Sequence, residues 1–322
     1  MLSLPFISPA LRLLALLASA AILYATPAVA AGPAAIPEVH ARTAMVDGQK
    51  VFYREAGNPK APVIVLLHGF PSSSHMYRHL IKQLATKYRV IAPDLPGFGF
   101  TEVAADSGFK YTFDGLTRTM AEFCDAVGLT RFAVYVFDYG APVGFRLASA
   151  DPEKVTAIIS QNGNAYVEGL SEAWSPIQAY WKSATAENRE ALRGLLTLET
   201  TRWQYVHGTP DANAVEPESY TLDAALMARP GNAEIQLDLF GDYGSNVAAY
   251  PKFQAYFRKH QPPLLAIWGK NDPFFVPAGA EAFKRDNPNA TVQMLDTGHF
   301  ALETHGAEIA AATHRFLAAH LN

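Results

Sequence analysis

Three polar side chains in this sequence, Asp138, Asp272 and His299, are of the types that carry out nucleophilic and acid–base chemistry. An aspartate carboxylate is a nucleophile, a histidine is a general base near neutral pH, and a second carboxylate fixes the histidine tautomer. Each of the three lies at or just after the end of an apolar run that predicts a buried strand. Because the carboxyl ends of parallel strands form the ligand-binding edge of a sheet, we expect the three side chains to lie together there.

Each residue taken alone also fits an ordinary structural role. Asp138 precedes a helical pattern and could cap it, Asp272 stands before a proline as turn residues often do, and His299 follows a glycine as a loop histidine would. The catalytic interpretation therefore depends on the set of three, in one strand-end context, rather than on any single residue.

The stretch around Asp138 shows how such a side chain is presented. Residues 132–137 are rich in valine and aromatics and predict a buried strand, and Gly140 and Ala141 open a helical pattern that continues through Ala148. A strand, a sharp turn and a helix with one reactive residue at the apex form a nucleophile elbow, in which small neighbours let the backbone approach closely.

The elements that must position these residues alternate along the chain. Strands followed by helices predict an α/β fold with a doubly wound, mostly parallel sheet. The expected strands span residues 51–55, 62–67, 89–92, 132–137, 155–160, 264–268 and 291–295, and the expected helices besides that of the elbow span about 76–86, 113–127, 278–285 and 307–319.

Between residues 167 and 261 the alternation stops, and aromatic-rich helical stretches are broken by proline and glycine. This predicts a helical cap inserted between two parts of an α/β core, residues 31–166 and 262–322. The cap aromatics either line an apolar pocket or pack the cap. They include Trp174, Trp181, Trp203 and Phe240.

The first thirty residues predict a secretory signal peptide. A single Arg12 precedes an apolar run over residues 13–25 and a small-residue ending, with cleavage expected after Ala30 or Ala31. The run is short for a membrane span, although an uncleaved anchor is the alternative. We therefore expect an exported protein, periplasmic or secreted, with no membrane association after cleavage.

Composition narrows the ligand classes. The formal charge of −4, with no basic block, gives no indication of nucleic acid as a partner and favours a small, uncharged, apolar substrate. Cys124 is the only cysteine, so no intramolecular disulfide forms, and its apolar surroundings in the sequence indicate a core position. The ten histidines show no zinc-binding spacing, so neither a metal nor another cofactor is expected.

With these motifs the chain after residue 40 resembles the α/β-hydrolase fold family, in which the triad follows the order nucleophile, acid, histidine. Within that family an aspartate nucleophile resembles the epoxide hydrolases and the dehalogenases. Beside the elbow, the motifs that carry the resemblance are His68-Gly-Phe-Pro71, Asp94-Leu-Pro-Gly-Phe-Gly99, Gly269-Lys-Asn-Asp272 and Gly298-His299. His68 and Asp94 are expected to have structural roles in their turns.

The chemistry of an aspartate nucleophile gives an independent reason for this reaction class. A carboxylate with an ordinary pKa of about 3.9 is ionised at neutral pH and needs no base to activate it. Attack on an sp³ carbon yields an ester, whereas attack on a carboxylic ester would yield a mixed anhydride, so esterase activity is disfavoured. His299, oriented by Asp272, would then activate water to hydrolyse the ester on Asp138.

The resemblance also implies residues that stabilise charge. The main-chain N–H groups of Phe70 and Tyr139 are expected to form the oxyanion hole for ester hydrolysis. Epoxide hydrolases of this fold use two cap tyrosines as acids for the ring oxygen. Tyr180, in Ile177-Gln-Ala-Tyr180-Trp181, and Tyr250, in Asn246-Val-Ala-Ala-Tyr250-Pro, resemble these segments, although a buried tyrosine can serve in packing alone.

Epoxide opening to a vicinal diol is therefore the favoured prediction, with two alternatives. Haloalkane dehalogenases commonly carry a polar residue after His-Gly and a tryptophan after the nucleophile, where this chain has Phe70 and Tyr139. Epoxide hydrolases usually have tryptophan at 139 and histidine at 137, so this chain departs from their pattern too. A non-catalytic binding protein of the same fold is the second alternative, against which the intact triad argues.

Overall fold

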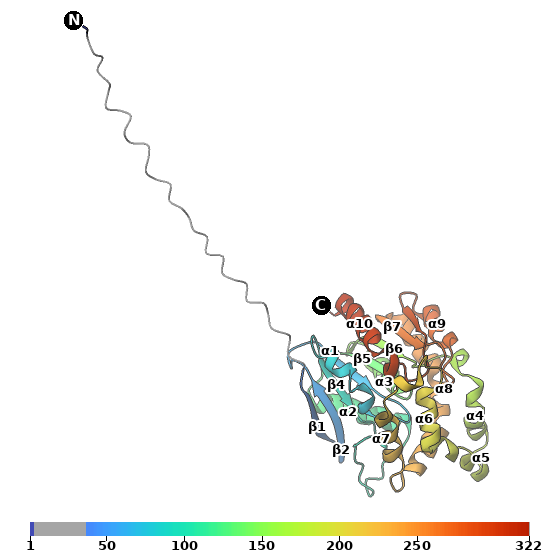
Figure 1. The fold of residues 1–322 in the computed structure, drawn as a ribbon. Helices are drawn as coiled ribbons and strands as arrows, with labels where there is room; N and C mark the ends of the chain where they lie inside the picture. Colours follow the sequence, from blue (N-terminus) through green and yellow to red (C-terminus); the bar gives the residue numbers. More distant parts are fainter. Residues whose placement is uncertain (3–36, 322) are drawn as a thin grey trace. The chain divides into compact units, whose positions relative to one another are not determined.

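A sheet of eight strands organises the part of the chain that this computed structural model describes, residues 1–2 and 37–321 (Figure 1). The strands are β1 (Val39–Val46), β2 (Gln49–Ala56), β3 (Val63–Leu67), β4 (Arg89–Pro93), β5 (Phe132–Phe137), β6 (Val155–Gln161), β7 (Leu264–Gly269) and β8 (Thr291–Leu295). Their spatial order is β1-β2-β4-β3-β5-β6-β7-β8, and only the β1–β2 and β2–β4 pairs are antiparallel. The predicted α/β fold with a mostly parallel sheet is confirmed.

Both faces of the central strands are covered, as parallel strands require. All six residues of β5 are buried, and successive side chains enter different cores. Val134 and Val136 pack toward α2 (Phe113–Ala126), α3 (Gly140–Ala150) and α9 (Pro277–Asp286), whereas Ala133, Tyr135 and Phe137 share the opposite core with α1 (Leu80–Leu84) and α10 (Leu302–His320). This alternation follows from the two-residue period of a strand.

Two elements differ from the expected ones. Strand β1 was missed because its side chains are mostly exposed at the sheet edge, so the sequence carries no apolar alternation there. The expected helix over residues 76–86 is instead a 3₁₀ turn, η1 (Ser74–Tyr77), followed by the short α1.

All the named elements between β6 and β7 are helices, and they lie within residues 167–261, the range predicted for the cap. The strands β1 and β2 lie at the edge of the fold opposite α4 and α5 (Figure 1). The elements of the segment are η2 (Val167–Gly169), η3 (Glu172–Trp174), α4 (Ser175–Lys182), α5 (Ala186–Ala191), η4 (Arg193–Leu196), α6 (Leu198–Val206), η5 (Ala212–Ala214), α7 (Pro217–Met227) and α8 (Asn232–His260).

Helix α8 connects the cap to the core. It runs for 29 residues through Pro251 and packs against α4 of the cap and against α2, α3 and α9 of the core. Residues spaced by seven along α8 lie on one face, two turns apart. Tyr243 and Tyr250, which are seven residues apart, therefore lie on the same face of α8.

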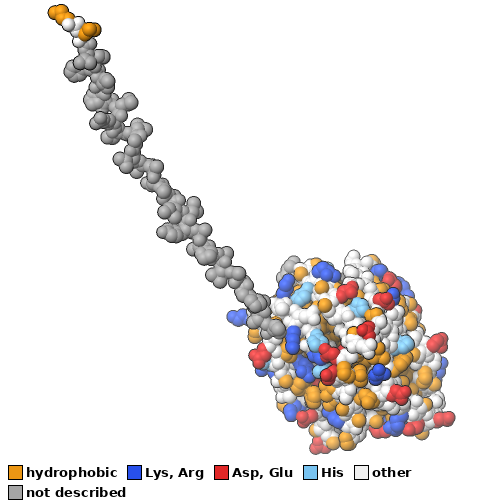
Figure 2. All heavy atoms as spheres, in the orientation of Figure 1, with side chains coloured by type: hydrophobic (Ala, Val, Ile, Leu, Met, Phe, Trp, Pro, Cys, Tyr) orange, Lys and Arg blue, Asp and Glu red, His pale blue; other side chains and the backbone are white. Residues whose placement is uncertain are grey.

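The predicted signal peptide at residues 1–30, with its cleavage position at Ala30 or Ala31, lies outside the described residues apart from Met1 and Leu2. None of the helices that the structure describes combines the length and the apolar character needed to cross a bilayer. The face in Figure 2 carries both acidic and basic side chains.

Candidate active site

Asp138 lies at the turn between β5 and α3, at the carboxyl edge of the sheet. Its backbone has a φ of +46°, a left-handed conformation that is uncommon for a residue other than glycine. The side chain is buried, with 6% of the residue's surface exposed. A strained, buried carboxylate at a strand-to-helix turn matches the predicted nucleophile elbow, and such strain is characteristic of functional sites.

One oxygen of the Asp138 carboxylate is held by a main-chain donor at close range. The N–H of Phe70 donates to Oδ1 over 2.6 Å, and the N–H of Tyr139 lies near enough to the carboxylate to lower its pKa. Gly69 makes this approach possible, because a Cβ at that position would overlap Oδ1 of Asp138. The two N–H groups predicted as an oxyanion hole therefore converge on the nucleophile itself.

Asp272 and His299 lie beside Asp138, although the three residues are far apart in sequence. His299 Nδ1 is 2.7 Å from Asp272 Oδ2, and His299 Nε2 is 3.9 Å from Asp138 Oδ2. In the tautomer that this favours, Nδ1–H donates to Asp272 and Nε2 is free to accept a proton. The arrangement is that of a general base aimed toward the carboxylate that Asp138 presents.

Asp272 is fixed by its own set of donors. Its Oδ1 accepts hydrogen bonds from the N–H groups of Phe274 and Phe275, at 2.7 and 3.1 Å. Its Oδ2 accepts a hydrogen bond from Asn162 Nδ2 at 2.7 Å, besides that of His299. These donors, together with His299, fix the orientation of the buried carboxylate.

Asn162 was not identified from the sequence. It follows β6, has a φ of +48°, and its Oδ1 accepts a hydrogen bond from the N–H of Gly269. The residue thus ties the end of β6 to the loop that carries Asp272. An Asn-Gly pair directly after a buried strand was the signal that could have indicated it.

The charges of the site are coupled. Burial raises the pKa of Asp138 to about 6, and the positive charge of His299 and the N–H groups of Phe70 and Tyr139 partly offset that rise. Burial lowers the pKa of His299, but the negative charges of Asp272 and Asp138 and the hydrogen bond with Asp272 outweigh it, so that its pKa is raised. Each of the two reactive groups therefore favours the charged state of the other.

Two tyrosines of α8, one of them not predicted, lie near the nucleophile. Tyr250 is buried and its hydroxyl accepts a hydrogen bond from Asn164 Nδ2 at 3.3 Å. Tyr243 is fully buried with its ring 5.6 Å from that of Tyr139, and its hydroxyl lies beside that of Tyr250 without a hydrogen bond of ordinary geometry. Burial raises the pKa of both phenols, and the negative charge of Asp138 adds to the rise.

The Tyr180 hydroxyl is held by a cationic side chain of the cap. It accepts a hydrogen bond from Arg189 Nη1 at 3.0 Å, and that guanidinium also pairs with Glu234 and Asp238 on the partly exposed side of α8. No hydrogen bond among the described residues joins Tyr180 to Asp138, Asp272 or His299. The Tyr180 hydroxyl is thus bound by Arg189, whereas the charge of Asp138 acts on the hydroxyls of Tyr243 and Tyr250.

An aromatic shell covers the nucleophile, and it includes three of the four cap aromatics named from the sequence. Phe240 lies 4.9 Å from Phe70, and Trp174 and Trp181 lie 4.5 and 5.9 Å from Tyr243, as distances between ring centroids. Trp203 is 41% exposed and does not belong to this shell. Phe113, Tyr139 and Phe275 complete it.

His68 and Asp94 have the structural roles expected of them. His68 Nε2 accepts a hydrogen bond from the N–H of Leu95, and its Nδ1 lies 3.1 Å from the carbonyl oxygen of Gly69. Asp94 accepts hydrogen bonds from the N–H groups of Ser74 and Phe100 and so ties its turn together. Burial lowers the pKa of His68, which indicates a neutral imidazole.

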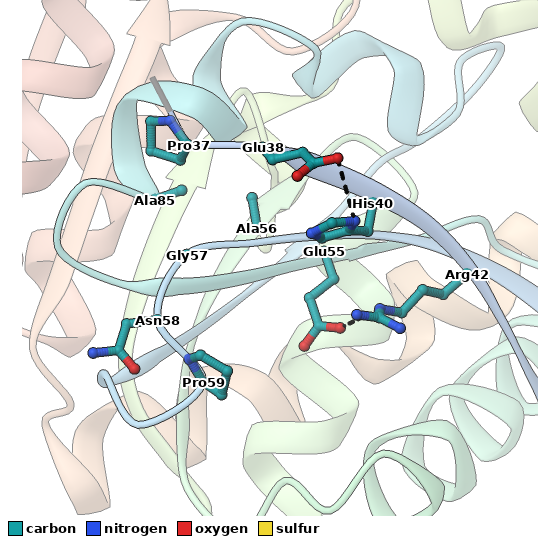
Figure 3. A pocket seen from close by; sticks show the side chains of 10 residues that line it. All are labelled: Pro37, Glu38, His40, Arg42, Glu55, Ala56, Gly57, Asn58, Pro59 and Ala85. Atoms are coloured by element: carbon teal, nitrogen blue, oxygen red, sulfur yellow. Dashed lines mark ion pairs between the residues drawn. The ribbon is translucent and has the colours of Figure 1, made fainter. Parts of the chain in front are cut away.

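Figure 3 shows a hollow of the surface, with a volume of about 430 Å³, whose lining includes no residue of the triad. It is lined by residues of β1, of the segment just before β1 and of the end of β2, including Glu38, His40, Arg42 and Glu55, with the ion pair between Arg42 and Glu55 inside it. Ala56 pairs with Val90 at the start of β4, so the hollow lies at the amino edge of the parallel strands. The nucleophile lies at the opposite edge.

Across residues 1–2 and 37–321, no group of three or more His, Cys, Asp or Glu side chains is placed to hold a metal ion. Cys124 is buried, and burial raises the pKa of its thiol to about 12, so it is un-ionised at neutral pH.

Known proteins that resemble this chain include a hydrolase, a haloalkane dehalogenase and an epoxide hydrolase. Residues 62–306 match the family model described as alpha/beta hydrolase fold. The chain is 48% identical to the uncharacterized hydrolase YNR064C of Saccharomyces cerevisiae over 82% of this chain and 92% of that protein, and 34% identical to haloalkane dehalogenase 2 of Mycobacterium tuberculosis over 82% and 90%. Among solved structures, epoxide hydrolase CorEH has a TM-score of 0.72 at 19% identity, covering 87% of this chain and 99% of that one.

Proposed function

We propose that this chain, which belongs to the α/β-hydrolase family, hydrolyses an epoxide to a vicinal diol through an ester on Asp138. The observation that carries the proposal is the position of Asp138. Its Oδ1 is held by the N–H of Phe70, while two phenols of α8, those of Tyr243 and Tyr250, lie close enough for its charge to raise their pKa. The charge of the nucleophile thus acts on two phenols that could serve as proton donors.

In the first step Asp138 Oδ2 attacks one carbon of the epoxide. The carbon–oxygen bond of the ring breaks, and the ring oxygen takes a proton from a phenol of Tyr243 or Tyr250. Negative charge leaves Asp138 and develops near the tyrosines. Because the charge of Asp138 contributes to the raised pKa of both phenols, its loss makes them stronger acids as the ring opens.

Ester formation also prepares the base. The negative charge of Asp138 is one cause of the raised pKa of His299, and the ester carries no charge. Alkylation of Asp138 therefore lowers the pKa of His299 toward the neutral form that accepts a proton. The same event that consumes the nucleophile activates the base for the next step.

In the second step His299 Nε2 removes a proton from water, and the oxygen of that water adds to the carboxyl carbon of Asp138. The negative charge of the tetrahedral intermediate forms on Oδ1, where the N–H groups of Phe70 and Tyr139 already point. Loss of one donor of this kind costs about a hundredfold to a thousandfold in rate. Collapse of the intermediate breaks its bond to the alkyl oxygen, which takes the proton of the new Asp138 carboxyl group and leaves in the diol. The proton on His299 returns through solvent to the phenolate formed in the first step, so that Asp138, His299 and the tyrosine regain their starting states.

The lining of the site supports a small, uncharged and apolar substrate. The shell around Asp138 is aromatic, and Arg189, the arginine that meets Tyr180, pairs with acidic residues of α8. A substrate carboxylate would have no cationic partner in this shell and would stand beside the charge of Asp138. Aromatic rings instead favour an alkyl or aryl epoxide.

Haloalkane dehalogenation is the second candidate, favoured by the 34% identity to proteins that carry that name. A departing halide needs N–H donors. Here the indole N–H of Trp174 donates to the carbonyl of Phe274 and that of Trp181 to the carbonyl of Phe240, so neither shell tryptophan is free to bind a halide. The phenols of α8 suit an epoxide oxygen, which needs a proton.

Intact mass measurement on the His299→Gln variant distinguishes the candidates, because removal of the base leaves the ester in place. After exposure to an aryl epoxide we expect a gain equal to the whole epoxide, located on Asp138 by peptide mapping. A gain of the alkyl group from a bromoalkane, with none from the epoxide, would favour the dehalogenase. Absence of any adduct would favour a non-catalytic protein.

A further inference from the structure

The C-terminal end of α6 contacts both loops that carry the acid and the base. Asn271, next to Asp272, donates from Nδ2 to the carbonyl of Gly208 at 2.9 Å. Gly298, next to His299, lies so close to the carbonyl oxygen of His207 that a Cβ at position 298 would overlap it. A cap segment far from the triad in sequence thus lies directly against the residues that precede Asp272 and His299.

Tyr205, in the last turn of α6, extends this contact toward the base. Its ring is fully buried and stacks on that of Phe300, with the centroids 3.7 Å apart and the planes 12° from parallel. Phe300 in turn meets the His299 imidazole edge-on at 5.3 Å. Movement of the Tyr205 ring would therefore shift Phe300 and, through it, the imidazole.

The Tyr205 ring is itself fixed by a buried acid. Its hydroxyl donates to Oδ2 of Asp223 on α7, and Oδ1 of Asp223 lies 3.5 Å from the hydroxyl of Ser73. Ser73 belongs to the loop that follows Phe70. The chain of contacts from Ser73 through Asp223 and Tyr205 to Phe300 joins the core, two cap helices and the histidine loop, and every member is buried.

We propose that Tyr205 is a positioning residue that holds His299 in place for hydrolysis of the ester, an inference that rests on the proposed function. The two steps depend on different supports. Asp138, which acts in the first step, is oriented by Phe70 and Tyr139, whereas His299, which acts in the second, is supported by Phe300 and Tyr205. A displacement of about 1 Å in a reacting group reduces a rate by roughly a hundredfold. Loss of the Tyr205 ring should therefore slow the second step selectively.

Single-turnover kinetics with an aryl epoxide test this, with the ester followed by intact mass after rapid quenching. For Tyr205→Leu we expect ester hydrolysis to slow by roughly tenfold or more and the ester to accumulate, with ester formation within about threefold of the parent rate. In the steady state kcat and KM should fall together. Tyr205→Phe keeps the stacked ring and should restore most of the hydrolysis rate.

Tyr220→Leu is the matched control. Tyr220, on α7, has its ring centroid 6.1 Å from that of Tyr205 and makes no ring contact with Phe300 among the described residues. It should leave both steps near the parent rates. If Tyr205→Leu does not fold, Phe300→Leu removes the same link from the other side and should show the same selective loss. Equal slowing of both steps, or no slowing of hydrolysis, in the variant that folds would overturn the inference.

The outcome with His299→Gln separates this inference from the proposed function. If that variant accumulates the ester and Tyr205→Leu hydrolyses it at the parent rate, Tyr205 has no positioning role and the function stands. If His299→Gln forms no ester, the proposed function is wrong and the role of Tyr205 falls with it.

Discussion

His299 Nε2 lies 3.9 Å from Asp138 Oδ2, too far for a hydrogen bond and near enough for each charge to alter the pKa of the other group. This separation fits a site with two successive tasks. Direct proton sharing would weaken the nucleophile, whereas charge coupling keeps Asp138 ionised and then releases His299 once the ester has formed. The pKa values that follow from this relationship can be tested directly.

The rate of ester formation should depend on the ionised form of Asp138, whose pKa burial raises to about 6. Below that value the carboxyl group is protonated and is no longer a nucleophile, so the rate should fall by about tenfold per pH unit. Single-turnover alkylation of His299→Gln, in which the base does not contribute to the profile, measures this. That substitution removes a positive charge that lowers the pKa of Asp138, so we expect the midpoint of the pH–rate profile at or above about 6. A midpoint near the ordinary carboxyl pKa of about 4 would contradict the argument that burial raises the pKa.

Asp138→Asn should abolish ester formation and stabilise the fold at neutral pH. The pKa of Asp138 is raised on folding, so its contribution to stability is fully present below the unfolded value near 3.8 and is lost as the pH rises through about 6. An amide has no such loss. We expect the free energy of unfolding of the Asp138→Asn variant to exceed that of the parent by about 3 kcal/mol near neutral pH and to differ little at about pH 4. Urea unfolding at the two pH values measures both.

Tyr243→Phe should slow ring opening far more than Tyr180→Phe. Tyr243 lies within the field of Asp138, whereas Tyr180 is hydrogen-bonded to Arg189. Removal of a general acid costs roughly a hundredfold, and Tyr250 remains as a second donor, so a loss of about tenfold to a hundredfold in ester formation is expected. Tyr180→Phe is the matched control and should stay within about threefold of the parent rate. A larger loss for Tyr180→Phe than for Tyr243→Phe would instead favour Tyr180 and Tyr250, the two acids predicted from the sequence.

Local patterns predicted the triad because each member is the polar end of an apolar strand. The α8 tyrosine could not be found in that way. Only helical stretches broken by proline and glycine were predicted for the cap, whereas α8 runs for 29 residues through Pro251, and that continuity places Tyr243 two turns from Tyr250 on one face. Asn162 was missed for a related reason, since its role depends on a left-handed turn and on a loop far away in the sequence. Strand β1 gave no signal because its exposed edge position needs no apolar alternation.

Asn162→Ala should impair ester hydrolysis and leave ester formation nearly unchanged. The substitution removes one of the donors to Oδ2 of Asp272, the oxygen that also binds His299 Nδ1. The acid then orients the imidazole less well, and roughly a tenfold loss in the hydrolytic step is expected. Rapid-quench mass measurement should show the ester accumulating. Asn162→Asp is no suitable comparison, because it would set a second carboxylate against Asp272. Asn188→Ala changes a partly exposed cap asparagine and should have no effect on either step.

Asp223→Asn should make the stability of the protein less dependent on pH. Asp223 is buried and its pKa is raised to about 8, by burial first and further by the charges of Asp94 and Glu303, while the Tyr205 hydroxyl and Arg78 lower it. Its stabilising contribution is therefore complete below about pH 4 and is lost as the pH rises toward 8, at up to roughly 1 kcal/mol per pH unit. The asparagine variant, which keeps an acceptor for Tyr205, should gain stability over the parent progressively between about pH 5 and pH 8 in urea unfolding. The control Asp106→Asn changes an exposed loop position and should show no such trend. If the free energy of unfolding depends on pH in the same way for the parent and for Asp223→Asn, the buried acid is ionised throughout this range and the prediction is wrong.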